Sequence, residues 1–297
     1  MSDLPANSAI ASWRPPASGQ AWGRYRRRFV PSARSRPVLV LSGACLAAIV
    51  LTFFLAPLIA PYGPNAQGVG LPLTGPSAAH WFGTDELGRD LFTRVLYGGR
   101  LSVVISSAAT AIAMALGCLW GVVAAMRGKW LDEVLMRSAD IVMATPQILL
   151  ALICVAAFGA SEVGLIVIIG FVLSPVTARM ARSVVLTEMA RDYYLAAIAY
   201  GASRGRLARR EILPNARRAL GVQATIVAAN AIILEASLSF VGLGIQPPAQ
   251  SLGSLLQEGY QFLYQSVTYS IFPAIIILVL IWLLTVFADQ LDPAGRA

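Results

Sequence analysis

Six long apolar stretches divide the chain, and shorter polar segments separate them. An α-helix rises 1.5 Å per residue, so about 20 apolar residues are needed to cross the hydrocarbon core of a bilayer. Stretches of about this length are residues 38–59, 101–126, 140–158, 164–180, 220–245 and 270–288. The pattern therefore predicts an all-α integral membrane protein with six transmembrane helices.

The third and fourth stretches are separated only by residues 159–163, which predicts a tight helical hairpin. The fourth is the least regular, because Pro175 lies within it and Arg179 and Arg182 crowd its end. The second stretch carries small residues at four-residue spacing, including Gly117 and Gly121. Small residues at this spacing let two membrane helices approach closely, so we expect Gly117 and Gly121 to form a helix-contact face within this chain.

The basic residues predict the orientation of the spans, since cytoplasmic loops carry an excess of Arg and Lys. Of the 23 Lys and Arg residues, only Arg89, Arg94 and Arg100 lie on one side of the predicted membrane, and the others lie on the opposite side. Both termini are therefore expected to be cytoplasmic. The positive charge follows the topology and does not form one patch, which argues against nucleic-acid binding.

Composition agrees with a membrane protein. Charged residues make up 13% of the chain, whereas soluble domains average about 25%. Each of the three cysteines lies in an apolar run, and one histidine cannot build a His-ligated metal site alone, so we expect neither disulfides nor a metal centre. Residues 1–37 are expected to be an Arg-rich cytoplasmic tail and not a cleaved signal peptide, because no apolar stretch begins before Arg36.

The chain shows no energy source of its own. A P-loop requires G-x-x-x-x-G-K-[ST], and the only Gly-Lys pair, Gly128-Lys129, is followed by Trp130. A secondary carrier is expected to have ionisable residues near the membrane centre, and Glu235 is the only acidic residue deep in a predicted span. A proton-coupled carrier that uses Glu235 therefore stays open as an alternative, as does a structural membrane protein that transports nothing.

A polar segment between the fourth and fifth stretches predicts a helix–turn–helix. Residues 188–200 contain helix formers and no breaker, Gly201 and Gly205 interrupt them, and a second short helix is expected from about Arg206 until Pro214 ends it. A structured insertion of this length is uncommon as a mere connection. We interpret it as a docking element in the cytoplasm.

The same segment resembles a known family motif. Ala196-Ala197, then Gly201, then Ile212-Leu213-Pro214-Asn215 are similar to the EAA loop of binding-protein-dependent ABC transporter permeases, although Leu195 stands where that family has Glu. In that family the loop inserts into a cleft of the ATPase subunit. The residues to which the resemblance assigns this coupling are Tyr194, Leu195, Ala196, Ala197, Gly201, Ala202, Ser203, Arg204, Ile212, Leu213 and Pro214.

Two further stretches narrow the resemblance. Residues 80–100 are similar to the segment after the first span of dipeptide, oligopeptide and nickel permeases, and residues 235–248 resemble the fifth-span signature of those proteins. Asp292-Pro293 matches their usual ending. From this resemblance we assign a pathway or structural role to Glu235, Ser239, Gly242 and Gly244.

The resemblance implies a C-type permease subunit with the type I importer fold, in the inner membrane of a bacterium. Its expected domain is residues 38–293, with an external loop at 60–100, a cytoplasmic coupling segment at 187–217 and a short end at 294–297. Its expected partners are a second homologous permease, two ATPase subunits that hold ATP and Mg, an external substrate-binding protein and a peptide. No cofactor and no enzymatic activity are expected in this chain. Nickel or another small solute stays open as the cargo.

The expected external loop has a physical interpretation of its own. Leu87, Leu91 and Val95 follow helical spacing, and Asp90 can pair with Arg94 on another face. We therefore predict an amphipathic helix on the outer membrane surface before Leu101, with Thr84 or Asp85 as its cap. The spacing of Asp85, Glu86 and Asp90 does not fit a calcium-binding loop.

Overall fold

The computed structural model describes residues 35–291, and this part of the chain is helical apart from loops and one isolated β-bridge between Thr84 and Asp90. Predictions that concern residues 1–34 and 292–297, including most of the tail and the Asp292-Pro293 ending, lie outside the described residues. The helices are α2 (Ser35–Phe54), α3 (Ala56–Ile59), α4 (Leu91–Arg127), α5 (Lys129–Ala144), α6 (Gln147–Phe158), α7 (Glu162–Met189), α8 (Asp192–Ala199), α9 (Arg204–Leu207), the π-helical η1 (Ala208–Ile212), α10 (Leu213–Phe240), α11 (Leu252–Gln261) and α12 (Val267–Leu291).

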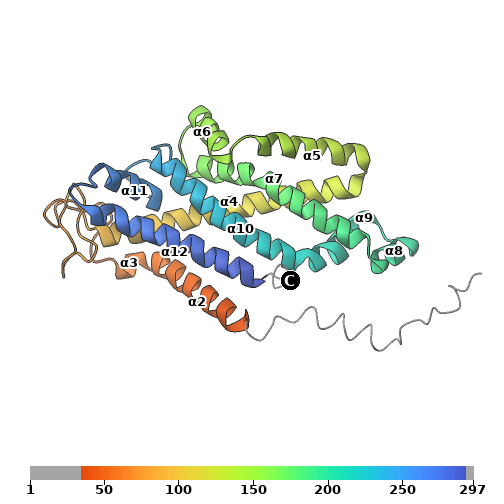
Figure 1. Ribbon diagram of the computed structural model, residues 1–297, viewed down its shortest axis with the longest axis horizontal. Helices are drawn as coiled ribbons and strands as arrows, with labels where there is room; N and C mark the ends of the chain where they lie inside the picture. Colours follow the sequence, from red (N-terminus) through yellow and green to blue (C-terminus); the bar gives the residue numbers. More distant parts are fainter. Residues whose placement is uncertain (1–34, 292–297) are drawn as a thin grey trace, which may run out of the picture.

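Five of the described helices are long and apolar enough to cross a membrane, and a sixth span results if α5 and α6 count as one bent pair. The five are α2, α4, α7, α12 and the continuous helix at 205–240 that contains α10. Each of these overlaps one predicted stretch. Figure 1 shows them as an elongated bundle in which residues 60–90 and α11 lie at one end and α8 and α9 at the other; we call these the loop end and the α8 end.

The third predicted span is not one helix. It begins at Lys129 and not at residue 140, and it bends by 89° between α5 and α6. The bend lies at Thr145, which has extended backbone, and at Pro146, whose φ of −52° and ψ of 126° are not helical. A proline disfavours helical geometry in the residue before it and has no N–H to donate, so Pro146 ends α5.

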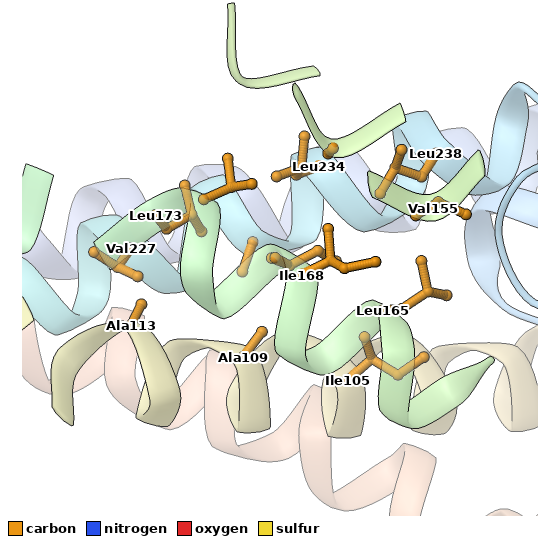
Figure 2. Close-up of a cluster of buried hydrophobic side chains, with 14 of the residues drawn as sticks. Ile105, Ala109, Ala113, Val155, Leu165, Ile168, Leu173, Val227, Leu234 and Leu238 are labelled. Atoms are coloured by element: carbon orange, nitrogen blue, oxygen red, sulfur yellow. The ribbon is translucent and has the colours of Figure 1, made fainter. Parts of the chain in front are cut away.

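The core lies between α4 and α7, which run side by side (Figure 1). Buried apolar side chains from these helices, α6 and α10 form one cluster, in which Ile105 and Ala109 of α4 lie opposite Leu165 and Ile168 of α7 (Figure 2). Farther along α4, both predicted contact glycines are at this interface. A Cβ atom on Gly117 would lie 2.6 Å from the carbonyl oxygen of Ser174, and one on Gly121 would collide with the backbone of Ala178.

The fourth span is longer than predicted. Pro175 lies inside α7 without ending it, and the helix continues past Arg179 and Arg182 to Met189. Both arginines have acidic partners in α5, Asp140 and Asp132 respectively. The helix formers from residue 188 onward are split, because Ala190 and Arg191 separate α7 from α8.

The predicted surface helix before Leu101 is wrong. α4 runs without a break from Leu91 to Arg127, and its cap is Asp90, whose side chain accepts a hydrogen bond from the Thr93 N–H at 2.8 Å. Leu91 and Val95 are buried in a core with α11 and α12, while Leu87 is exposed. Residues 60–90 fold over the beginning of α4, so the apolar face that the sequence suggested for a membrane surface contacts protein.

Pro214 does not end a helix. η1 leads into α10, and Pro214 lies in the first turn of α10, where a missing N–H and a fixed φ are tolerated. The fifth span ends at Phe240 and not at residue 245. The sequence interpretation also missed α11, a short amphipathic helix that packs against α12, α10 and α4.

Candidate functional sites

The segment at the α8 end is anchored by apolar side chains. Tyr194 of α8, Leu207 of α9 and Ile212 of η1 are buried together with Val185 of α7. Val122, Ala125 and Met126 near the end of α4 pack against this cluster. The segment is therefore fixed to both helices of the core, and a displacement of α8 would act directly on α4 and α7.

Gly201 ends α8 in a Schellman motif. Its φ is +79°, its N–H donates to the carbonyl of Ile198 at 2.8 Å, and the N–H of Ala202 donates to the carbonyl of Ala197 at 3.0 Å. A left-handed residue at this position favours glycine, because any side chain would be strained there. The motif turns the chain sharply away from α8 and explains why glycine occurs at this place in the segment.

The opposite face of α8 is uncovered. Leu195 is 57% exposed, Ile198 is 48% exposed and Tyr200 is 92% exposed. Leu195 and Ile198 are three residues apart and so lie on one side of the helix. The buried side of α8 packs against the core, and its exposed side is apolar. An exposed apolar surface of this kind is typical of a protein-docking site.

Polar side chains brace α8 against its neighbours. The hydroxyl of Tyr193 donates to Glu188 Oε2 at 2.6 Å and accepts from Asn215 Nδ2 at 3.2 Å, and Arg191 pairs with Glu188 at 3.0 Å. Burial, together with the hydrogen bond to Glu188, raises the pKa of Tyr193 above its ordinary value. The tyrosine is therefore a neutral hydrogen-bonding link between the end of α7 and the beginning of α10.

The structure divides the predicted coupling residues into two groups. Tyr194 and Ile212 are buried, and Ala197, Ala202 and Leu213 are half-buried. The exposed ones are Leu195, Ala196, Gly201, Ser203 and Pro214. Arg204 is the first residue of α9. The sequence interpretation assigned no role to Tyr193 and Glu188 and noted Asn215 only as part of the motif, since only contacts in space connect these three residues.

Glu235 lies in a fully buried hydroxyl cluster near the loop end. Ser239 Oγ donates to Glu235 Oε1 at 2.9 Å, and Ser251 Oγ donates to Ser239 Oγ at 3.2 Å. Ser102 Oγ accepts from the Leu252 N–H at 3.0 Å. Glu235 Oε2 has no hydrogen-bond partner among residues 35–291. The cluster joins α10 to α4 and to the beginning of α11.

The two predicted glycines after this cluster serve backbone geometry. Gly242 has a φ of +87° and ends α10 in a second Schellman motif, in which its N–H donates to Ser239 and the N–H of Leu243 donates to Leu238, both at 3.0 Å. A Cβ on Gly244 would collide with Ser239. These positions therefore fold the chain back over α10 so that Ser251 reaches the Glu235 cluster.

A buried ion cluster holds the loop end together. Arg94 Nη1 donates to Asp85 Oδ2 at 2.8 Å and to Glu258 Oε2 at 2.9 Å, while Arg94 Nε donates to Gln250 at 2.8 Å. The hydroxyl of Tyr269 lies 3.0 Å from Arg94 Nη1. This cluster connects the 60–90 loop, α4, α11 and α12.

The ion partners at the loop end differ from those predicted. Arg94 does not pair with Asp90, because Asp90 contacts His80 at 2.9 Å and caps α4. Arg89 binds Asp85 and Glu86 at 2.5 and 2.8 Å. The described residues contain no group of three or more His, Cys, Asp or Glu side chains placed to hold a metal ion.

Comparison with known proteins identifies the family. The family model described as "Binding-protein-dependent transport system inner membrane component" matches residues 113–296, more than half of the chain. The chain belongs to this family. It is a permease of an ABC transporter and not an enzyme, since the ATPase activity of these systems lies in separate subunits.

Curated relatives share most of the permease. A protein of Brucella suis biovar 1 (strain 1330) whose name includes the words peptide permease is 39% identical, over 81% of this chain and 78% of that protein. The dipeptide transport system permease protein DppC of Alkalihalophilus pseudofirmus is 36% identical over 84% of each chain. The di/tripeptide transport system permease protein DppC of Pseudomonas aeruginosa is 35% identical over 83% of each.

A solved structure supports the fold. The permease resembles a chain of the inward-facing MetNI methionine ABC transporter with a TM-score of 0.55, over 67% of this chain and 94% of that one. The sequences are 20% identical, so this likeness concerns the fold alone. The architecture is therefore that of an ABC importer permease.

Proposed function

We propose that this permease moves di- or oligopeptides into the cytoplasm as part of an ATP-driven importer, and that residues 187–217 couple it to the ATPase subunits. It forms the translocation pathway together with a second homologous permease. Two ATPase subunits hold ATP and Mg, and an external binding protein delivers the peptide. The permease itself carries no cofactor.

The observation that carries the coupling role is the two-sided construction of α8. Tyr194 on its inner face is buried in one cluster with Leu207 of α9 and Ile212 of η1, against α4 and α7. Leu195, Ile198 and Tyr200 are exposed. A displacement of α8 by a bound subunit would therefore move α4 and α7 with it, because close-packed side chains shift as a rigid body and do not deform continuously. The likeness of the segment to the EAA loop supports the same role.

The charge distribution supports a cytoplasmic α8 end. Exposed arginines, among them Arg206, Arg210, Arg217 and Arg218, gather at that end. At the loop end, two of the three arginines are neutralised, because Arg89 and Arg94 bind carboxylates. The excess of arginines at the α8 end follows the positive-inside pattern, and it supports six spans with both termini in the cytoplasm.

Peptide cargo is supported by the relatives, whose printed names describe dipeptide or di/tripeptide transport. Nickel is a weaker candidate, since the described residues contain no cluster of three or more His, Cys, Asp or Glu side chains placed to hold a metal ion, and His80 contacts Asp90. A proton-coupled carrier is also weaker. Glu235 is fully buried and accepts a hydrogen bond from the Ser239 hydroxyl. A carboxyl group that relays protons would need contact with water.

The test is copurification of the ATPase subunits with the permease from nanodiscs. Wild type is expected to retain both ATPase subunits. Ile198→Glu places a charge on the exposed apolar face of α8 and is expected to release them, as is Gly201→Arg, which strains the Schellman motif. Both variants are first checked for folding by size-exclusion chromatography.

The matched control is Glu211→Gln, a charge change at an exposed side chain in η1 on the same segment. It is expected to retain the ATPase subunits. Retention of the subunits by Ile198→Glu would contradict the coupling role. ATP-dependent uptake of a labelled dipeptide into proteoliposomes tests the cargo separately.

A further inference from the structure

A polar cleft of about 380 Å³ lies between side chains of α5 and of the α8-end half of α7. Figure 1 shows the course of these two helices. Charged side chains of both signs line it, with Met136 as the apolar member. The lining residues are Lys129, Asp132, Glu133, Met136, Arg137, Asp140, Arg179 and Arg182. Its volume falls in the range of small-molecule sites, about 300–1,000 Å³.

Two ion pairs cross the cleft and differ in their exposure. Arg182 binds Asp132 with two hydrogen bonds of 2.5 and 2.6 Å, and these side chains are 33% and 23% exposed. Arg179 binds Asp140 with one hydrogen bond of 2.6 Å, and these side chains are 58% and 42% exposed. The first pair braces α5 against α7. The second pair is open to whatever fills the cleft.

The cleft must face water. Asp140 lies in α5 before the bend of the third predicted span, and Arg179 lies in α7, a helix apolar enough to cross the membrane. Half-exposed charges at such positions do not face lipid, because hydrocarbon cannot solvate them. They face a water-filled cavity.

The charges also indicate the chemistry of the occupant. Four basic and three acidic side chains line the cleft, so it carries little net charge but offers both a cation and an anion within one exposed pair. A simple anion would have to compete with Asp140 for Arg179, and a simple cation would have to compete with Arg179 for Asp140. A zwitterion exchanges with the pair, because its ammonium group binds Asp140 while its carboxylate binds Arg179.

We propose that this cleft is a water-filled release site for zwitterionic peptides at the cytoplasmic side of the pathway, with Asp140 and Arg179 as the groups that contact the two peptide termini. The proposal rests on the proposed function, because it assigns the site where the cargo of that function leaves.

The test is the accessibility of a reporter cysteine. Cys45, Cys118 and Cys154 are replaced by Ala, and Met136→Cys is introduced into the full transporter in inside-out membrane vesicles. A charged, membrane-impermeant methanethiosulfonate is expected to modify this cysteine quickly. Leu278→Cys, on the exposed apolar face of α12, is expected to stay unmodified.

The occupant is tested by protection. Millimolar alanyl-alanine is expected to slow the modification of Met136→Cys about threefold to fivefold, the range that an exposed charged contact supplies. N-acetyl-alanyl-alaninamide, which has the same side chains without charges at its ends, is expected to give no protection. Arg179→Gln and Asp140→Asn are each expected to abolish protection, while Arg218→Gln, at an exposed arginine outside the cleft, retains it.

The outcomes separate this proposal from the proposed function. An unmodified cysteine would overturn the water-filled cleft. Equal protection by the charged and the blocked peptide, or protection that persists in Arg179→Gln, would overturn the role of the ion pair. Wild-type uptake of alanyl-alanine in the same preparation tests the proposed function, so uptake without protection overturns the release site alone.

Discussion

Arg94 and Asp85 form a buried ion pair in which Arg94 Nη1 lies 2.8 Å from Asp85 Oδ2, and the two side chains are 3% and 0% exposed. The pair joins α4 to the 60–90 loop, and Glu258 and Gln250 bring α11 and the segment before it into the same cluster. The Arg94 guanidinium group thus links three segments of the loop end, and Arg89, which binds Asp85 and Glu86, adds to the same cluster.

Removing this guanidinium is expected to destabilise the permease. Arg94→Met removes one of the two arginines that pair with Asp85, the other being Arg89, so the loss is expected at or below the roughly 3–5 kcal/mol of a buried pair broken on one side. Thermal unfolding in detergent should show a clearly lower midpoint for Arg94→Met. The control is Arg100→Met at an exposed arginine of the same helix, and an equal midpoint for the two variants would contradict the prediction.

The α4–α7 contact predicts a steric effect at Gly121. A side chain there meets the backbone of Ala178 and the side chain of Ala181, and overpacking of this kind costs about 1–3 kcal/mol. Gly121→Val is expected to lower the yield of monodisperse protein. Gly221→Val is the matched control, since a Cβ at Gly221 has no neighbour within 4 Å in the described part of the chain, and it should behave as wild type.

The Schellman motif at Gly201 makes α8 sensitive to a single methyl group. Gly201→Ala forces an L-residue into a left-handed conformation and costs about 1–2 kcal/mol locally. We expect faster proteolytic cleavage between α8 and α9 and less ATPase stimulation, with the spans intact. Gly205→Ala is the control, because Gly205 lies in α9 and a Cβ there meets no atom within 4 Å among the described residues. Equal cleavage rates would count against the motif.

The hydrophobic pattern was sufficient to predict five of the spans, because burial in lipid requires long apolar helices whatever their neighbours; the bend between α5 and α6 in the third predicted span was missed. Sequence patterns that predict single helices and their ends were less reliable wherever tertiary contacts determined where a helix begins, ends or is buried. Leu91 and Val95 have the spacing of a surface helix, yet the 60–90 loop covers them. Pro214 was expected to end a helix, yet it lies in the first turn of α10, where a proline is tolerated.

The candidate sites show the same division. Gly201 and Gly242 were found by resemblance, and the structure explains them through their left-handed backbone. Pairs such as Arg94 with Glu258 were beyond sequence reasoning, because 164 residues separate them along the chain.

Glu235 distinguishes the importer from a proton-coupled carrier. Its carboxyl group is fully buried and its Oε1 atom accepts a hydrogen bond from Ser239 at 2.9 Å; Gln has nearly the same shape and keeps a carbonyl oxygen for that bond. Glu235→Gln is therefore expected to retain most of the ATP-dependent uptake and the same pH profile between pH 5 and 8.

Glu235→Leu removes the acceptor and leaves the buried Ser239 hydroxyl without it, which costs about 1–3 kcal/mol and should lower the thermal midpoint. A carrier that moves protons through Glu235 would behave in the opposite way, because its Gln variant would fold normally and lose both uptake and pH dependence. Uptake measured for both variants over this pH range, together with their thermal midpoints, decides between a structural link and a proton relay.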